Sequence, residues 1–242
     1  MKGDALVKDD VKRAWEESGR DRSVDTVVFT VGKTNTFTFI RQPLLTLMQG
    51  GGKFKLAKGM VMTPPNLVTM CFLNVITTMP EPSETNPIPP KMVVITSTGL
   101  TPESHRSLPV LLRPMYSYLL DQPHKDKLGT ERLAFHCIGR EWPNAVPEPT
   151  EDIMGSDWAN SEGLPKFGTF SNVLIVHPAL LTDGECVADK VEKSGKKKKP
   201  YKVSSEEVSG YTVSRKDVAH FIVEDALKNW EKYRNTIATI VY

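Results

Sequence analysis

The sequence predicts an α/β fold in which helices cover both faces of a parallel sheet. Four short runs are apolar and rich in β-branched residues, at 24–32, 91–99, 171–184 and 235–242. A continuous apolar run, in place of an alternating one, is typical of a parallel strand that is buried on both faces. Segments with helical patterns separate these runs, and strands that alternate with helices favour a parallel α/β sheet.

The first helix is predicted at residues 7–19, directly before the first strand. Val7, Val11 and Ala14 lie on one side of this helix, which predicts its buried face. Gly19 follows the last periodic residue and indicates where the helix ends.

Helical signals also stand on either side of the second strand. Thr63 is the predicted cap of the preceding helix, Pro64 suits its first turn, and Pro80 ends it. After the second strand, residues 107–139 predict a proline-interrupted helix followed by a more regular one that ends near Gly139.

The last predicted helix lies within residues 211–230. Ser214 and Asp217 have the spacing of a capping box, which places the helix start at Ser214. Its apolar face has the helical spacing of a packed surface. This face consists of Val218, Phe221, Ile222 and Ala226.

Three ranges fall outside the alternation of strands and helices. Residues 33–52 follow the first strand directly and are predicted to be an insertion. Residues 140–168 and 186–200 are rich in proline or charge and are predicted to be surface loops. The remaining pattern predicts one incomplete domain over residues 1–242.

Composition excludes several classes of protein. A formal net charge of +2 gives no reason to expect nucleic acid or a membrane surface as a partner. The three cysteines Cys71, Cys137 and Cys186 are widely spaced, which favours a reducing, cytoplasmic compartment. The five histidines lack the spacing of metal ligands, so no metal site is expected.

Phosphate-binding motifs are missing from the chain as written. None of the glycines forms the GxGxxG pattern of a dinucleotide-binding loop. The GKT tripeptide at 32–34 matches the last residues of the P-loop pattern. However, Val27 occupies the position where that pattern requires its first glycine.

Two residues are candidates for chemistry. Ser97 lies at the carboxyl end of a predicted strand, where open α/β sheets bind ligands, although serine is also common there for local hydrogen bonding. Lys127 lies in a predicted helix four residues before Glu131. It is either a surface residue in an ion pair or a cation that faces the ligand crevice.

Six segments, spread over most of the chain, together resemble one protein family. The segments are GDALVKDDVKRAW, VDTVVFTVG, VVITSTGL, PHKDKLGTERL, VLIVHPALLTDG and YTVSRKDVAHFI. In this order they resemble the atypical short-chain dehydrogenase/reductases of the NmrA-like and biliverdin/flavin-reductase-like kind. The resemblance implies a Rossmann-like sheet that binds NAD(P), with NADP preferred. It further implies hydride transfer to a small carbonyl or flavin-like acceptor, the exact substrate being unknown.

The resemblance also assigns residues to the adenosine end of this cofactor. Asp4 corresponds to the family's contact with the adenine edge. Thr30, Val31 and Gly32 correspond to the segment beside the adenine ribose and the pyrophosphate.

At the nicotinamide end, the resemblance places Thr96 and Ser97 below the ring, and Lys127 matches the family's helix lysine. Ser97 and Lys127 are therefore the expected catalytic pair. His177 and Pro178 stand beside the nicotinamide amide, where relatives often have Arg-Pro.

Two departures from the family pattern leave alternatives open. Catalytic members have a tyrosine four residues before the lysine, and this chain has Pro123 there. In the family, GDA follows the third strand, so the first β-α-β unit and its glycine loop are expected before Met1. Without that unit, the strand at 24–32 is expected to form an exposed sheet edge. The alternatives are a non-catalytic dinucleotide sensor with a protein partner, or a non-functional fragment.

Overall fold

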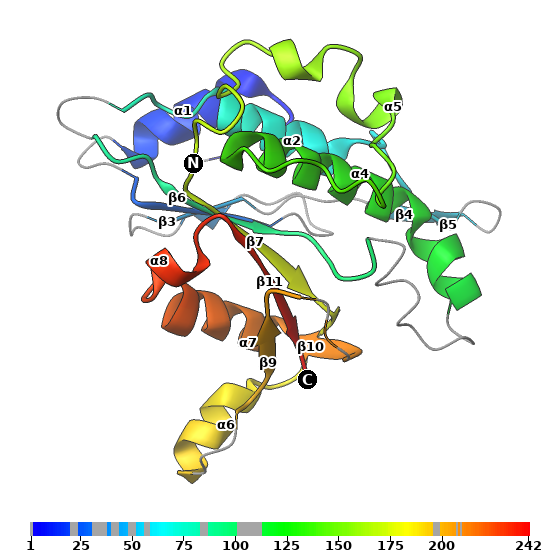
Figure 1. The fold of residues 1–242 in the computed structure, drawn as a ribbon, viewed down its shortest axis with the longest axis vertical. Coiled ribbons are helices and arrows are strands. Elements are labelled where there is room, and N and C mark those ends of the chain that lie inside the picture. Colours follow the sequence, from blue (N-terminus) through cyan, green and yellow to red (C-terminus); the bar gives the residue numbers. More distant parts are fainter. Residues whose placement is uncertain are drawn as a thin grey trace.

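The computed structural model describes residues 2–19, 24–30, 38–39, 44–47, 52–55, 59–82, 87–100, 113–195, 199–206, 208 and 210–242. Within these ranges it confirms the α/β fold (Figure 1). The described strands of the main sheet follow the order β2-β3-β1-β6-β7-β11-β9. Their bounds are β1 Thr26–Phe29, β2 Thr38–Phe39, β3 Leu44–Leu47, β6 Lys91–Ile95, β7 Val173–Pro178, β9 Lys202–Ser204 and β11 Thr236–Val241.

The centre of this sheet is parallel, and the two outer strands are antiparallel. β3, β1, β6, β7 and β11 pair in parallel, while β2 and β9 pair antiparallel with their neighbours. The four predicted strands are β1, β6, β7 and β11. Two further pairs lie outside the main sheet: β4 (Gly52–Lys55) with β5 (Gly59–Met62), and β8 (Leu180–Thr182) with β10 (Thr212–Ser214).

The predicted exposed edge at the first strand is wrong. β3 pairs with β1 on the side away from β6, with Thr26 opposite Leu44 and Phe29 opposite Leu47. β3 belongs to the range 33–52 that the sequence predicts as an insertion. β3 therefore pairs with backbone groups of β1 that an edge strand would leave unpaired.

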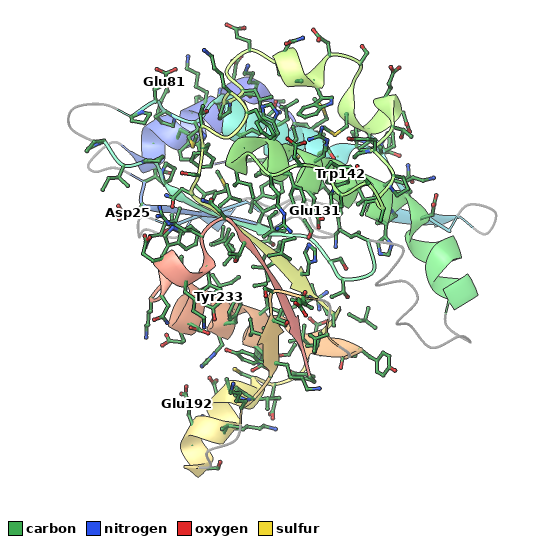
Figure 2. The ribbon with its side chains drawn as sticks, viewed as in Figure 1. Asp25, Glu81, Glu131, Trp142, Glu192 and Tyr233 are labelled. Carbon is green, nitrogen blue, oxygen red and sulfur yellow. The ribbon has the colours of Figure 1, made fainter. Side chains whose placement is uncertain are left out.

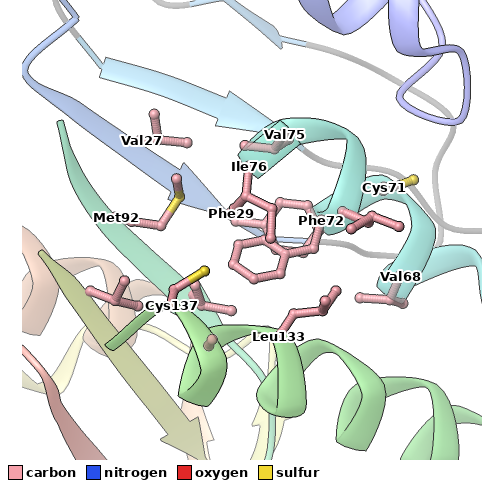
Figure 3. Close-up of a cluster of buried hydrophobic side chains, with 14 of the residues drawn as sticks. Val27, Phe29, Val68, Cys71, Phe72, Val75, Ile76, Met92, Leu133 and Cys137 are labelled. Atoms are coloured by element: carbon pink, nitrogen blue, oxygen red, sulfur yellow. The ribbon is translucent and has the colours of Figure 1, made fainter. Parts of the chain in front are cut away.

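Helices cover both faces of the sheet (Figure 1). One face packs against α1 (Lys8–Ser18), α2 (Leu67–Thr77) and α4 (Arg113–Ile138). The other packs against α7 (Arg215–His220), a π-helical segment (Phe221–Ala226) and α8 (Trp230–Tyr233). Figure 3 shows the first of these cores, where the rings of Phe29 and Phe72 lie 5.0 Å apart.

Alternation along the strands sends neighbouring side chains to opposite cores. Val27 and Phe29 enter the core under α2, while Val28 enters the core over α7. Both cores are therefore built from the same short apolar runs, which explains why those runs are continuous.

The helices differ from the prediction in three details. Val7 precedes α1 and is exposed, whereas Trp15 is buried and its indole N–H donates to the backbone oxygen of Val75. α4 continues through Pro123 as one helix. The ranges 140–168 and 186–200, expected as loops, contain α5 (Glu151–Met154), a short 3₁₀ turn (Trp158–Asn160) and α6 (Val187–Ser194).

Asp217 links several elements near the carboxyl terminus. The predicted cap is confirmed, because Ser214 Oγ accepts from the backbone N–H of Asp217 at 2.9 Å. The buried Asp217 carboxylate also accepts from the N–H groups of Val187 and Ala188, which begin α6. The hydroxyls of Ser214 and Tyr242 donate to the same carboxylate, at 2.6 and 2.5 Å.

Gly129 lies where α4 packs tightly against Thr69 of α2. A Cβ at this position would overlap Thr69 Oγ1 and lie 2.6 Å from Ile153 Cγ2. Thr69 cannot turn away freely, because its hydroxyl donates to the backbone oxygen of Asp126 at 2.6 Å. The absence of a side chain at Gly129 therefore allows the short distance between α4 and α2.

We expect Gly129→Ala to lower the free energy of unfolding by about 1–3 kcal/mol, since overpacking outweighs the gain in helix propensity. Urea unfolding at neutral pH measures this difference. The control is Gly184→Ala, where the nearest atom to the new Cβ is 3.6 Å away. Equal stability of Gly129→Ala and the wild type would contradict the tight packing.

A second prediction concerns acid stability. Burial alone would raise the pKa of Asp217, but hydrogen bonds from Ser214, Tyr242, Val187 and Ala188 outweigh it and lower the pKa to about 2. A carboxyl with a lowered pKa stabilises the fold above the ordinary value near pH 4, and that stability is lost as the pH falls toward 2.

Asp217→Asn should therefore be less stable than the wild type at pH 7. The gap between the two should shrink by about 2 kcal/mol between pH 4 and pH 2. Urea unfolding across this pH range tests it. Asp183→Asn removes an exposed carboxylate that pairs with Arg215 and should keep the wild-type acid dependence. If the difference in unfolding free energy between the wild type and Asp217→Asn stays constant from pH 4 to pH 2, the Asp217 carboxylate does not cause the loss of stability in acid.

Candidate active site

The carboxyl ends of β6 and β7 place two polar side chains next to each other. The backbone N–H groups of Thr96 and Thr98 donate to the oxygens of Val176 and Pro178, on either side of His177. Side chains two positions apart in a strand lie on the same face of the sheet. Val94 and Ile175, two residues before Thr96 and His177, enter the core beneath α4. Thr96 and His177 therefore face α4 as well.

Glu131 of α4 completes this group and lies between the helix and the sheet (Figure 2). Its Oε1 accepts a hydrogen bond from Thr96 Oγ1 at 2.5 Å and lies 2.8 Å from Nε2 of His177. Glu131, Thr96 and His177 are all buried. The three side chains come from three elements and form one buried polar cluster.

Lys127 lies one helical turn before Glu131 and joins the same group. Its Nζ donates to the backbone oxygen of Thr96 at 2.8 Å. Burial lowers the pKa of Lys127 to about 8, although the carboxylates of Glu131 and Asp126 oppose this shift. Of the two interpretations that the sequence left open, the structure supports the inward-facing cation, because Glu131 is buried and is no surface partner.

Asp126 uses the opposite side of the same turn to hold α2. Its carboxylate accepts from the backbone N–H groups of Val68 and Thr69, at 2.7 and 2.8 Å. Burial raises the pKa of Asp126, while these backbone hydrogen bonds oppose the shift. The prediction that α2 begins with a Thr63 cap is wrong: the helix starts at Leu67, and its first N–H groups are capped from α4.

The other predicted residues lie on separate elements. Thr30 is half-buried directly after β1, and Ser97 is half-buried directly after Thr96. Pro178 ends β7 opposite Ile240. Asp4 is exposed in the turn before α1, where its Oδ1 accepts from the N–H of Leu6 at 2.9 Å. Val31 and Gly32 lie outside the described residues.

The structure thus brings together Thr96, Lys127 and His177, and adds two residues that the sequence did not assign. Glu131 was visible only through its spacing from Lys127, and its contact with His177 joins distant parts of the chain. Asp126 carried no sequence signal as a cap, because the N–H groups that it binds belong to another helix.

The rest of the described chain adds little to this site. Its His, Cys, Asp and Glu side chains form no group of three that could hold a metal ion. A separate pocket of about 230 Å³ lies at the amino end of β11, beside Lys232 and Tyr233. No helix among the described residues is long and apolar enough to span a membrane.

Comparison with known proteins gives one informative similarity. No family model matches the chain, and no solved structure matches it. The chain is 30% identical over 200 residues to Reductase pytE of Aspergillus terreus. The aligned region covers 79% of this chain and 64% of that protein, so the chain spans less than two thirds of its relative's length.

The bond from Thr96 to the buried Glu131 gives a testable stability effect. Thr96→Val keeps the side-chain shape but removes the donor, leaving the carboxylate with one partner fewer. We expect a loss of about 1–3 kcal/mol in the free energy of unfolding, measured by urea titration. Thr182→Val is the control, since its Oγ1 is 3.5 Å from the Val213 oxygen and should contribute little. Equal losses in both variants would contradict the assigned role of Thr96.

Proposed function

We propose that the chain is a reductase-type protein that binds NAD(P)H, with NADP preferred, at the carboxyl ends of β1, β6 and β7. The similarity to a reductase supports the reaction class. The observation that carries the location is the hydrogen bond from Lys127 Nζ to the oxygen of Thr96, which aims a half-buried cation at the strand ends. Open α/β sheets bind their ligands at this edge.

The residues present fit the nicotinamide end of such a cofactor. Lys127 supplies donors for ribose hydroxyls, and Thr96 and His177 add polar atoms within the same small region. Ser97 directly follows Thr96 in the chain. Thr30, at the end of β1, stands where the resemblance places the adenine ribose. When bound, the reduced cofactor would supply a hydride to a small carbonyl, enone or flavin-like acceptor.

A non-catalytic dinucleotide sensor is the second candidate, and one observation favours it. Pro123 lies inside α4, one turn before Lys127, where catalytic members of the resembled family have tyrosine. Proline offers no acidic proton to a substrate oxygen. A sensor would keep the cofactor site and lack turnover.

The proposal predicts that NADPH binds and stabilises the folded chain. A ligand present at about 100 times its Kd stabilises a protein by about 2.7 kcal/mol, so the melting temperature of the full chain should rise with NADPH. Lys127→Met should weaken NADPH binding about tenfold, because it removes a charged donor. Differential scanning calorimetry measures the rise in melting temperature, and isothermal titration calorimetry measures the NADPH affinity of the two proteins.

Lys125→Met is the matched control. Lys125 belongs to the same helix but is exposed and pairs with Asp121. Its replacement should leave the NADPH affinity unchanged. Absence of saturable binding by the wild type, with either NADPH or NADH, would reject the proposal. If NADPH binds but is not oxidised by any of a panel of carbonyls, enones and flavins, the sensor is favoured over the reductase.

A further inference from the structure

Glu131 is a buried acidic residue whose charge is balanced by the site itself. The residue is 3% exposed, and moving an unpaired carboxylate out of water is costly. Thr96 and His177 contact one of its oxygens, and Lys127 lies one turn away on the same helix. All three residues are among those that the resemblance places at the nicotinamide end.

The contact with His177 brings the carboxylate against the imidazole ring. Glu131 Oε1 lies 2.8 Å from His177 Nε2, which is within ion-pair distance. The contact lacks the geometry of a hydrogen bond, so it restricts the position of the ring and does not select its tautomer.

The same carboxylate acts on Lys127 through its charge. Two carboxylates of α4 act on this ammonium, those of Glu131 and Asp126. His177 of β7 contacts the first of them. Burial favours the neutral amine and lowers the pKa of Lys127 to about 8, and Glu131 is the stronger of the two carboxylates that oppose the shift. Loss of the Glu131 charge would move Lys127 closer to neutrality at physiological pH.

We propose that Glu131 is the positioning residue of this site: it holds Thr96 and His177 in place and supplies a negative charge one helical turn from Lys127. The inference deepens the proposed function and rests on it for the identity of the ligand. Its physical core, the coupling of Glu131 to Lys127 and His177, is measurable without any cofactor.

Two substitutions separate charge from hydrogen bonding. Glu131→Gln keeps an oxygen that can accept from Thr96 but removes the charge. Glu131→Leu removes both. Glu148→Gln is the matched control, because Glu148 is an exposed carboxylate that pairs with Arg132 of α4. Thermal melting of each variant shows which of them remain folded.

NMR of the full chain with ¹⁵N-labelled lysine and histidine gives the cofactor-free readout. In Glu131→Gln, Lys127 should lose its proton at a pH about one unit or more below the wild-type value near 8. The ring resonances of His177 should shift in Glu131→Leu, where the contact with the carboxylate is lost. The control should match the wild type in both respects.

Binding of NADPH gives the functional readout. At pH 8, Glu131→Gln should bind NADPH about five- to tenfold more weakly than the wild type. Near pH 6, where Lys127 is protonated in both proteins, the difference should largely disappear. A purely structural role for Glu131 would weaken binding equally at both values of pH.

The outcomes separate the proposed cofactor from the positioning role of Glu131. If Lys127 and His177 respond as expected but the wild type does not bind NADPH, the proposed cofactor is wrong and the coupling by Glu131 holds. If Lys127 titrates identically in Glu131→Gln and Glu148→Gln, the positioning role of Glu131 is overturned. Unchanged ring resonances of His177 in Glu131→Leu would overturn it as well.

Discussion

The arrangement depends on one polar turn of α4 that is buried between two other layers of structure. Asp126 turns toward α2 and caps its first N–H groups, while Lys127 and Glu131 turn toward the ends of β6 and β7. Charged groups removed from water must be paired or hydrogen-bonded. Each of these contacts therefore restrains both the side chain and its partner. The helix, the neighbouring helix and the strand ends are thereby held in one geometry.

The close packing of α4 follows from the same requirement. Gly129 lies within this turn and lets α2 approach, which brings Thr69 to the backbone oxygen of Asp126. A larger residue would separate the helices and break the hydrogen bonds that cap α2. Both packing and polar contacts therefore restrain the polar turn of α4, and this restraint holds the side chains of the site in position.

Local signals predicted much of the fold, and contacts between distant residues explain the rest. The apolar runs predicted β1, β6, β7 and β11, and the spacing of Ser214 and Asp217 predicted a real cap. The start of α2 was missed because its cap comes from α4. The pairing of β3 with β1 was missed because it depends on register between segments that carry no mutual signal. At the site, Thr96, Lys127 and His177 were named from resemblance, but only the three-dimensional structure joins them through Glu131.

We propose above all that the polar turn of α4 and the ends of β6 and β7 bind a nicotinamide dinucleotide. Hydrogen–deuterium exchange of the full chain, with and without saturating NADPH, tests it most directly. The account predicts slower exchange of backbone amides at 96–100 and 177–180 when NADPH is present. No change at these segments, or protection confined to the pocket beside Lys232 and Tyr233 at the far end of β11, would contradict it.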